Sequence, residues 1–386
     1  MPKSKIKKRT TQESLQAQQP KKQDLAQKNA SPQIIFGPVL SRRFGRSLGV
    51  DLSPSTKQCN FDCVYCELYK AKPMESMREV FPYQRILREI ETALKSHQDI
   101  SVLTFTATGE PTLYPQLYEL ITATKPLLPP HIKTLILSNG SRFYEQKKAL
   151  QHFDIVKFSL DAGILSAFKK IDRPSHLLSL ENILKGIEDF SAEYGGELVA
   201  EVLLVEGHND SEENLRAIAD FLGRVKISRV DLGSIDRPSA YQVKSVSEKK
   251  LLWASKFFAN LNLSLPKRNQ IQNGKIQSSP TNLTQEGKIL TPKSSPKSNA
   301  DFDLTFAKND TKSTQDFAKS SVGETHYAQK NYDKDSLLKF LSTRPVEQSE
   351  ATMLFSPSTL KLLDSLLCNG EIILKSQPPY TFYTTK

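Results

Sequence analysis

Residues 57–67 read KQCNFDCVYCE, and the three cysteines of this stretch guide the interpretation of the whole chain. Cys59, Cys63 and Cys66 follow a C-x3-C-x2-C spacing, while the fourth cysteine, Cys368, lies near the other end of the sequence. Three clustered thiolates can bind three irons of a cubane cluster, which ordinarily has four cysteine ligands. One iron would then lack a protein ligand, and an open metal position suits catalysis. A zinc site with a distant fourth ligand and three unrelated buried cysteines are the alternatives.

Apolar runs around this motif alternate with segments of helical period. The expected strands are 46–52, 101–107, 132–137, 154–160, 197–205 and 230–235. The expected helices between them include 83–94, 113–124, 180–190 and 212–222. Such alternation predicts parallel strands joined by crossover helices. Six units are fewer than the eight of a closed barrel, so a partial barrel and a doubly wound sheet both fit.

Unusual residues follow the expected strands. They are the segments Thr108-Gly109-Glu110-Pro111, Ser138-Asn139-Gly140, Asp161-Ala162-Gly163 and Asp236-Arg237-Pro238. Ligands bind at the carboxyl ends of parallel strands in both candidate folds. Each segment alone is also ordinary turn chemistry, but four of them beside a thiolate cluster favour a binding site.

The basic charge of the chain lies mainly outside the expected barrel. The formal net charge is +11, of which residues 1–30 carry +6 and residues 266–331 carry +4. We interpret 1–30 as a disordered basic tail, which is favoured over a nucleic-acid-binding arm. No apolar run is long enough to span a membrane, and the N-terminus lacks the apolar core of a secretory signal. With the clustered thiols, this predicts a cytoplasmic protein.

The C-terminal third predicts a linker and a small module. Residues 267–333 are rich in Ser, Thr, Asn, Gln and Lys and are interpreted as a disordered low-complexity linker. Residues 334–386 show two helical stripes, with Ser356-Pro357 as a helix start, and then a hairpin. This order predicts a winged-helix-like module. The second helix carries one base, Lys361, so a structural or protein-contact role is at least as well supported as nucleic-acid binding.

The cysteine motif, with an aromatic residue before its last cysteine, resembles the signature of the radical S-adenosylmethionine (SAM) superfamily. The resemblance covers about residues 34–245 and implies that residues 31–266 form a partial (β/α)6 barrel. It also implies a 4Fe–4S cluster on the three cysteines and SAM on the open iron. A reductant such as flavodoxin or ferredoxin would supply the electron that cleaves SAM to a 5′-deoxyadenosyl radical.

The resemblance also implies cofactor-binding residues. Tyr65 would lie against the adenine of SAM. Thr108, Gly109 and Glu110 match the family's Gly-Gly-Glu-Pro strand end, which meets the SAM ammonium, although Thr108 replaces the first glycine. The remaining expected contacts, to the ribose or the methionine carboxylate, are Ser138, Asn139, Ser159 and Asp161.

Three further segments resemble one branch of the superfamily, the enzymes related to wyosine-forming tRNA modification. They are residues 36–50, 170–174 and 236–238. The expected substrate residues in them are Arg42, Arg43, Arg46, Arg173, Asp236 and Arg237, with ion pairs to Asp51 or Asp62 as the structural alternative for the first three. No cysteine precedes Cys59, so the second cluster of the archaeal type is expected to be absent. A tRNA base is therefore one expected substrate, and an iron–sulfur regulatory protein that binds nucleic acid is the competing hypothesis.

Overall fold

The computed structural model describes residues 32–41, 43–266, 271–272, 275–276, 331–343, 345–377 and 380–385. The chain divides into two compact units, Met1–Ser264 and Leu265–Lys386. The expected tail 1–30, and most of the expected linker, lie outside the described residues. Within the described ranges, no helix is both long enough and apolar enough to cross a membrane.

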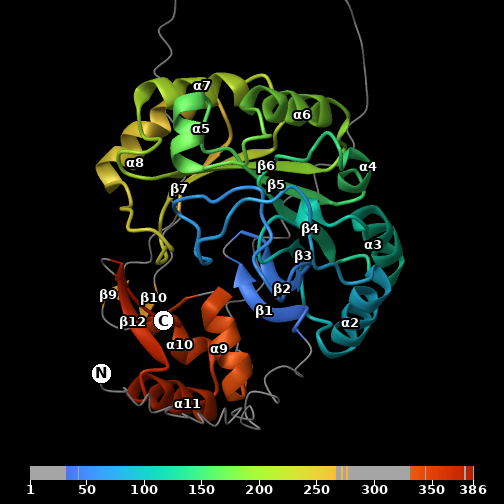
Figure 1. Ribbon diagram of the computed structural model, residues 1–386, viewed down its shortest axis with the longest axis vertical. Coiled ribbons are helices and arrows are strands. Elements are labelled where there is room, and N and C mark those ends of the chain that lie inside the picture. The colour runs from blue at the N-terminus through green and yellow to red at the C-terminus, as the bar shows by residue number, and fades with distance from the viewer. Residues whose placement is uncertain are drawn as a thin grey trace, which may run out of the picture. The chain divides into compact units, whose positions relative to one another are not determined.

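The first unit is built on an eight-stranded sheet whose spatial order follows the sequence from β1 to β8 (Figure 1). Strands β2 to β8 are parallel, and β1 pairs antiparallel with β2. The strands are β1 Ile35–Ser41, β2 Gly45–Asp51, β3 Val102–Thr106, β4 Lys133–Ser138, β5 Ile155–Ser159, β6 Glu197–Leu204, β7 Arg229–Ser234 and β8 Leu263–Ser264. A doubly wound sheet reverses its strand order at a switch point. This sheet does not, which confirms the partial barrel.

Helices cover the outer side of this curved sheet (Figure 1). They are α2 Tyr83–Ser96, α3 Leu117–Thr124, α4 Lys147–Leu150, α5 Leu165–Ile171, α6 Leu180–Glu193, α7 Glu212–Leu222 and α8 Glu248–Ser255. Short 3-10 turns lie at Pro111–Leu113, Lys125–Leu127 and Lys256–Phe258. The helix α7 shows why these segments are helical: Ser211 caps its first turn and accepts a bond from the Asn214 N–H, and Leu215 and Ile218 give it a buried face.

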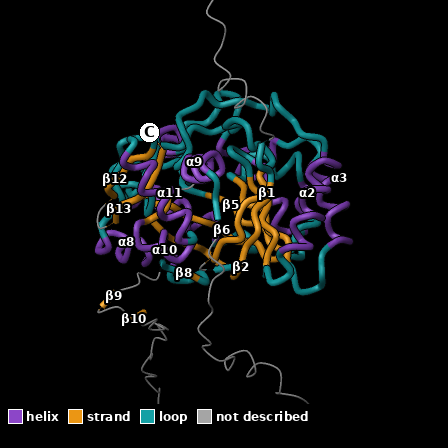
Figure 2. The backbone as a smooth tube through the Cα atoms, turned by 90° about the horizontal axis from the view of Figure 1, so that it is seen from below, coloured by secondary structure: helices purple, strands orange, loops and turns teal. Residues whose placement is uncertain are grey.

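The inner side of the sheet is apolar at the amino ends of the strands. Val102, Leu135, Ile155 and Val199 form one buried cluster there, with Phe44 packed against it. Figure 2 shows the strands of this unit side by side, with β1 next to β2. Because side chains alternate between the two faces of a strand, the residues two and four positions later face the same interior, nearer the carboxyl ends.

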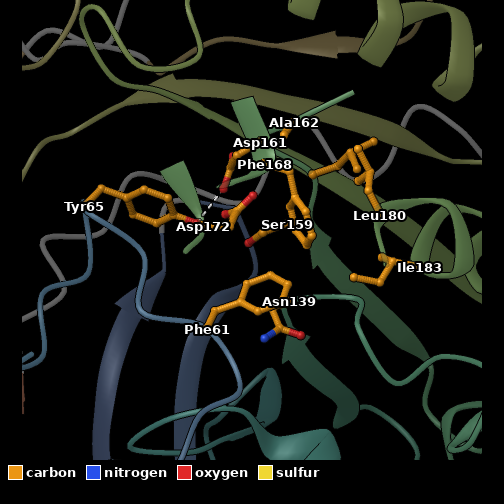
Figure 3. A pocket seen from close by; sticks show the side chains of 11 residues that line it. Phe61, Tyr65, Asn139, Ser159, Asp161, Ala162, Phe168, Asp172, Leu180 and Ile183 are labelled. Atoms are coloured by element: carbon orange, nitrogen blue, oxygen red, sulfur yellow. Dashed lines mark hydrogen bonds between the residues drawn. The ribbon is translucent and has the colours of Figure 1, made fainter. Parts of the chain in front are cut away.

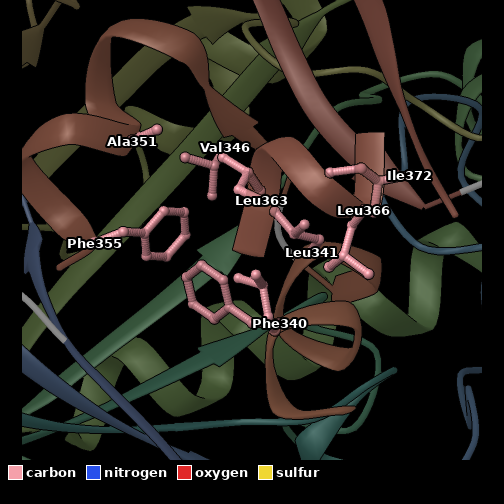
Figure 4. Packing of buried hydrophobic residues seen from close by; sticks show 9 residues of the cluster. Phe340, Leu341, Val346, Ala351, Phe355, Leu363, Leu366 and Ile372 are labelled. Atoms are coloured by element: carbon pink, nitrogen blue, oxygen red, sulfur yellow. The ribbon is translucent and has the colours of Figure 1, made fainter. Parts of the chain in front are cut away.

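The second unit is a three-stranded antiparallel sheet with three helices. The elements are α9 Lys334–Thr343, β11 Val346–Glu347, α10 Gln348–Leu354, α11 Pro357–Cys368, β12 Ile372–Gln377 and β13 Tyr380–Thr385, and the sheet order is β11-β13-β12. Its core includes Phe340, Phe355, Leu363 and Leu366 (Figure 4). Helices followed by a hairpin confirm the expected winged-helix-like module. A separate short pair, β9 Ile271–Gln272 with β10 Lys275–Ile276, falls within the expected linker.

Candidate functional site

Residues 57–67, which we call the cysteine loop, are hydrogen-bonded near their start to the segment that follows β3. The Gln58 N–H donates to the Thr108 carbonyl at 2.9 Å, and the Glu110 N–H donates to the Gln58 carbonyl at 2.9 Å. Gly109 lies between them with a φ of 138°, and a Cβ there would stand 1.9 Å from the Gln58 carbonyl oxygen. Only glycine has both the conformational freedom and the small size that this close approach requires.

Thr108, which replaces the family's first glycine, has a partner of its own in this structure. Its hydroxyl donates to Asp51 Oδ2 at 2.6 Å, and its N–H donates to Asp51 Oδ1 at 2.7 Å. Asp51 ends β2 and is buried. The threonine therefore ties the end of β2 to the end of β3, next to the start of the cysteine loop.

Two later segments of the chain form the other walls of the loop. After α5, the carbonyl of Ile171 accepts from the Val64 N–H at 2.9 Å, and that of Asp172 accepts from the Asp62 N–H at 3.1 Å. After β7, the Ala240 N–H donates to the Cys66 carbonyl at 2.9 Å. Segments that are far apart in the sequence thus hold one loop.

The three thiols are partly buried and none forms a disulfide. Burial raises the pKa of Cys59 to about 12, with a contribution from the Glu110 carboxylate. Burial raises the pKa of Cys63 well above its usual value, and the nearby Asp172 and the other two thiols raise it further. Burial also raises the pKa of Cys66, although Lys57 opposes the change.

A bound metal cation would oppose these shifts, since it stabilises the thiolates that coordinate it. This donor set fits an iron–sulfur cluster. Across the described ranges, no three His, Cys, Asp or Glu side chains are placed to hold a metal ion together. The cysteines of a cubane differ from such ligands because each binds a separate iron.

Glu110 is buried and connects two strand ends. Its Oε1 accepts from the Ser138 hydroxyl at 2.8 Å and from the Thr112 hydroxyl at 2.6 Å, and its Oε2 accepts from the Asn139 N–H at 2.7 Å. Burial raises its pKa, while these hydrogen bonds oppose the rise. The resemblance predicts that this carboxylate meets the SAM ammonium, and within the chain its oxygens accept from these side-chain and backbone donors.

Four of the expected cofactor residues line one cavity at the strand ends (Figure 3). These are Tyr65, Asn139, Ser159 and Asp161, and the other lining residues include Phe61, Phe168 and Asp172. Figure 3 shows the Tyr65 hydroxyl directed at Asp161, with a hydrogen bond of 2.5 Å. Burial raises the pKa of Asp161 to about 7. The Asn139 amide donates to Asn60 Oδ1 at 2.8 Å and lies 3.9 Å from Cys59 Sγ.

Thr108, Gly109, Glu110 and Ser138 are not among the residues that line this cavity. They stand behind it, because Thr108 and Gly109 join the cysteine loop to β3 and Glu110 holds Ser138 and Asn139. The structure thus separates the eight expected residues into a lining group and a supporting group.

The arginines near the start of the chain lie elsewhere than expected. Arg46 pairs with Asp99 at 3.2 Å at the amino end of β2, whereas the cysteine loop follows the carboxyl end. Arg43 pairs with Asp231 at 3.2 Å, on the inner side of β7. Neither pairs with Asp51 or Asp62 in these contacts, and neither stands beside the cysteine loop. Arg42 lies outside the described residues.

The later charged residues do lie at the loop. Arg173 stands 3.6 Å from Asp62, and Arg237 stands 3.4 Å from Glu67. Asp236, next to Arg237, is exposed. The segments 170–174 and 236–238 are therefore part of the site's wall.

Sequence reasoning missed several residues of the site. Asp172 lines the cavity and accepts a 3.7 Å hydrogen bond from the Cys63 thiol. Tyr241 donates to Asp62, and its ring is flanked by Lys70 and Arg173 at 4.4 and 4.6 Å. Asp172 lies within a segment that carried the resemblance, but no spacing rule pointed to Tyr241.

Comparisons with known proteins show which family the chain belongs to. The family model described as "Radical SAM superfamily" matches residues 53–222. A "UPF0026 protein" of Helicobacter pylori strain J99 is 45% identical over 353 residues, which cover 91% of this chain and 97% of that protein. A UPF0026 protein of Methanocaldococcus jannaschii is 32% identical over 211 residues, covering 53% of this chain and 64% of that protein.

A solved structure described as "TYW1 with a lysine-pyruvate adduct bound" is more distant. It is 18% identical, covers 55% of this chain and 73% of that chain, and has a TM-score of 0.40. The assignment rests instead on the sequence matches. The superfamily uses a 4Fe–4S cluster and SAM, which are therefore the cofactors of this protein. The chain belongs to the UPF0026 family of the radical SAM superfamily.

Proposed function

We propose that Cys59, Cys63 and Cys66 hold the 4Fe–4S cluster and that the cavity lined by Tyr65, Asn139 and Asp161 receives SAM. The observation that supports this most is the junction of the cysteine loop with the ends of β3 and β4. Asn139 lies at once in the cavity wall and 3.9 Å from Cys59 Sγ, so the thiols and the cavity adjoin.

The bound cofactors supply reductive cleavage of SAM to a 5′-deoxyadenosyl radical, and the chain supplies the geometry. The cysteines would leave one iron of a bound cubane without a protein ligand, because they provide three ligands. Phe61, Phe168 and Ile183 line the cavity with apolar surface, which limits the access of water to a reactive species. The hydrogen bond from Tyr65 to Asp161 fixes the orientation of the Tyr65 ring.

As substrate class we propose a base in tRNA, whose hydrogen atom the radical would abstract. The support is the resemblance of segments 170–174 and 236–238 to the tRNA-modifying branch. Contacts of both segments with the cysteine loop support a role for their charged residues in binding the substrate. A reductant such as flavodoxin or ferredoxin is the proposed electron donor, in a reducing cytoplasmic compartment.

The test is anaerobic reconstitution with iron and sulfide, followed by assay of 5′-deoxyadenosine after dithionite reduction with SAM, in the presence and absence of total tRNA. We expect about four irons and four sulfides per chain and production of 5′-deoxyadenosine. Cys63→Ser should lose both. Cys368→Ser, which changes an exposed cysteine of the second unit, is the matched control and should keep both.

Each proposal has its own contradicting outcome. Bound cluster without 5′-deoxyadenosine would favour the regulatory, nucleic-acid-binding hypothesis. Zinc in place of iron would contradict the cluster assignment. Production of 5′-deoxyadenosine with no modified nucleoside in the recovered tRNA would refute the tRNA substrate alone.

A further inference from the structure

Lys57 is a buried lysine two residues before the first cysteine. Its side chain is 2% exposed, although lysine is almost never fully buried unless its charge is paired. The ammonium donates to the Tyr69 carbonyl at 2.9 Å and to Cys66 Sγ at 3.5 Å. It thus directs a positive charge at one of the three proposed cluster ligands.

The carboxylate that pairs with Lys57 is shared with a second cation. Asp62 Oδ1 stands 3.8 Å from Lys57 Nζ, which is beyond hydrogen-bond distance. Asp62 also faces Arg173 at 3.6 Å and accepts from the Tyr241 hydroxyl. One buried carboxylate therefore serves two cations. Since Arg173 is 44% exposed, solvent screens it more than it screens Lys57.

The charge is placed asymmetrically around the thiols. Cys63 lies on the acidic side, where its thiol contacts the buried Asp172 at 3.7 Å. Cys66 lies on the basic side, beside Lys57. Reduction adds one electron to an iron–sulfur cluster and makes it more negative, so a fixed cation beside a ligand sulfur stabilises the reduced form.

We propose that Lys57 is a positioning residue that raises the reduction potential of the bound cluster through its charged hydrogen bond to Cys66. This rests on the proposed assignment of Cys66 as a cluster ligand. The electron comes from dithionite in the test and from the flavodoxin-class or ferredoxin-class donor in the cell. By raising the potential, Lys57 brings the cluster within reach of that donor.

The experiment is a potentiometric titration of the reconstituted full-length protein without SAM, followed by EPR of the reduced cluster. In Lys57→Met, which has similar length but no charge, the ratio of reduced to oxidised cluster at a fixed potential should fall at least about tenfold. This corresponds to a midpoint about 59 mV lower for a one-electron couple, on the order expected for one charge-assisted hydrogen bond. Lys57→Arg, which keeps a cation, should recover most of the loss.

Two further variants separate charge from packing. Lys57→Gln keeps a neutral donor, and its midpoint should remain close to that of Lys57→Met because the charge provides the larger effect. Lys72→Met removes an exposed lysine a few residues beyond the motif and should leave the midpoint unchanged.

The outcomes distinguish this inference from the proposed function. If the unaltered protein binds no 4Fe–4S cluster, the proposed function is wrong and the inference fails with it. If clusters form in the Lys57 variants and have the same midpoint reduction potential as the cluster of the unaltered protein, the inference alone is overturned. It is equally overturned if none of the three Lys57 variants retains a cluster, since Lys57 would then act in folding or cluster retention.

Discussion

At the residue scale, the contact between Gly109 and Gln58 sets the distance between the cysteine loop and β3. The Gln58 side chain adds to it, since its Nε2 donates to the Glu79 carbonyl at 2.9 Å and its Oε1 accepts from the Arg78 N–H at 2.6 Å. Gln58 is thus bonded on its backbone to the end of β3 and on its side chain to the segment that follows the motif. A displacement of Gly109 would therefore shift Gln58 and, with it, the segment that follows the motif.

We expect Gly109→Ala to destabilise the first unit and to lower its cluster content. Backbone strain at a φ of 138° contributes about 1–3 kcal/mol, and the close contact with the Gln58 oxygen adds to it. Thermal unfolding and iron content measure the two effects. Gly195→Ala is the control, because no atom lies within 4 Å of the added Cβ. Equal stability of the two variants would show that the Gly109 turn tolerates a side chain.

The sequence predicted which residue types end the strands but not their partners. Asn139 and Asp161 line the cavity as the strand-end pattern suggested. Glu110 stays a predicted cofactor contact, and its oxygens also accept from Ser138, Thr112 and the Asn139 backbone, which the sequence did not predict. Such partners depend on rotamers and on strand register, which short sequence patterns do not specify.

At the element scale, Asp154 joins three elements just before β5. Its Oδ1 pairs with Lys125 at 2.6 Å, after α3, and its Oδ2 accepts from the Thr134 N–H at 2.7 Å, in β4. Its own carbonyl accepts from the Glu197 N–H at the start of β6. Despite an opposing effect of burial, the hydrogen bonds from Lys125 and Thr134 hold the pKa of Asp154 below its usual value.

This lowered pKa predicts the pH dependence of one contribution to stability. Because the folded-state pKa lies below the unfolded value, the stabilisation is fully present above about pH 4 and is lost as pH falls through the folded-state pKa. Asp154→Asn should therefore reduce the free energy of unfolding in urea at pH 7, with a smaller difference at pH 3. Asp189→Asn, which breaks an exposed pair with Lys185 on α6, should have less effect at pH 7. A difference for Asp154→Asn that grows in acid would contradict the assignment.

Strand prediction succeeded where apolar runs were long and failed at the edges of the sheet. The six expected strands correspond to β2 through β7, because buried parallel strands are nearly continuous in apolar residues. The edge strand β1 contains Gly37 and Pro38, and β8 has two residues, so neither carries that signal. The order of the strands, which decides between a partial barrel and a doubly wound sheet, was not contained in the pattern.

At the scale of the whole molecule, the chain contains separate hydrophobic cores. The second unit buries Leu363, Leu366 and Phe355 among its own helices and sheet. In the first unit, Leu215 and Ile218 form part of the buried face of α7. The alternation of strands and helices predicted the first core, and the two helical stripes predicted the second.

We expect calorimetry to show two unfolding transitions that respond to different substitutions. Leu363→Ala should destabilise the second unit by about 2–5 kcal/mol and leave the transition of the first in place. Leu215 is an equally buried leucine in the first unit. Leu215→Ala should destabilise the first unit and leave the transition of the second in place. If either variant shifts both transitions together, the two units unfold as one cooperative system.

The walls of the cysteine loop have a consequence for the maturation of the protein. The loop itself lies in the first fifth of the chain, yet it is held by Thr108, Asp172 and Ala240. Parallel strands pair only after long crossovers have closed, so these contacts form late in folding. A nascent chain therefore emerges with its three thiols exposed long before their surroundings exist. With these cysteines as the proposed cluster ligands, we expect the cluster to be inserted after the whole first unit has been synthesised, and the thiols to be open to oxidation until then.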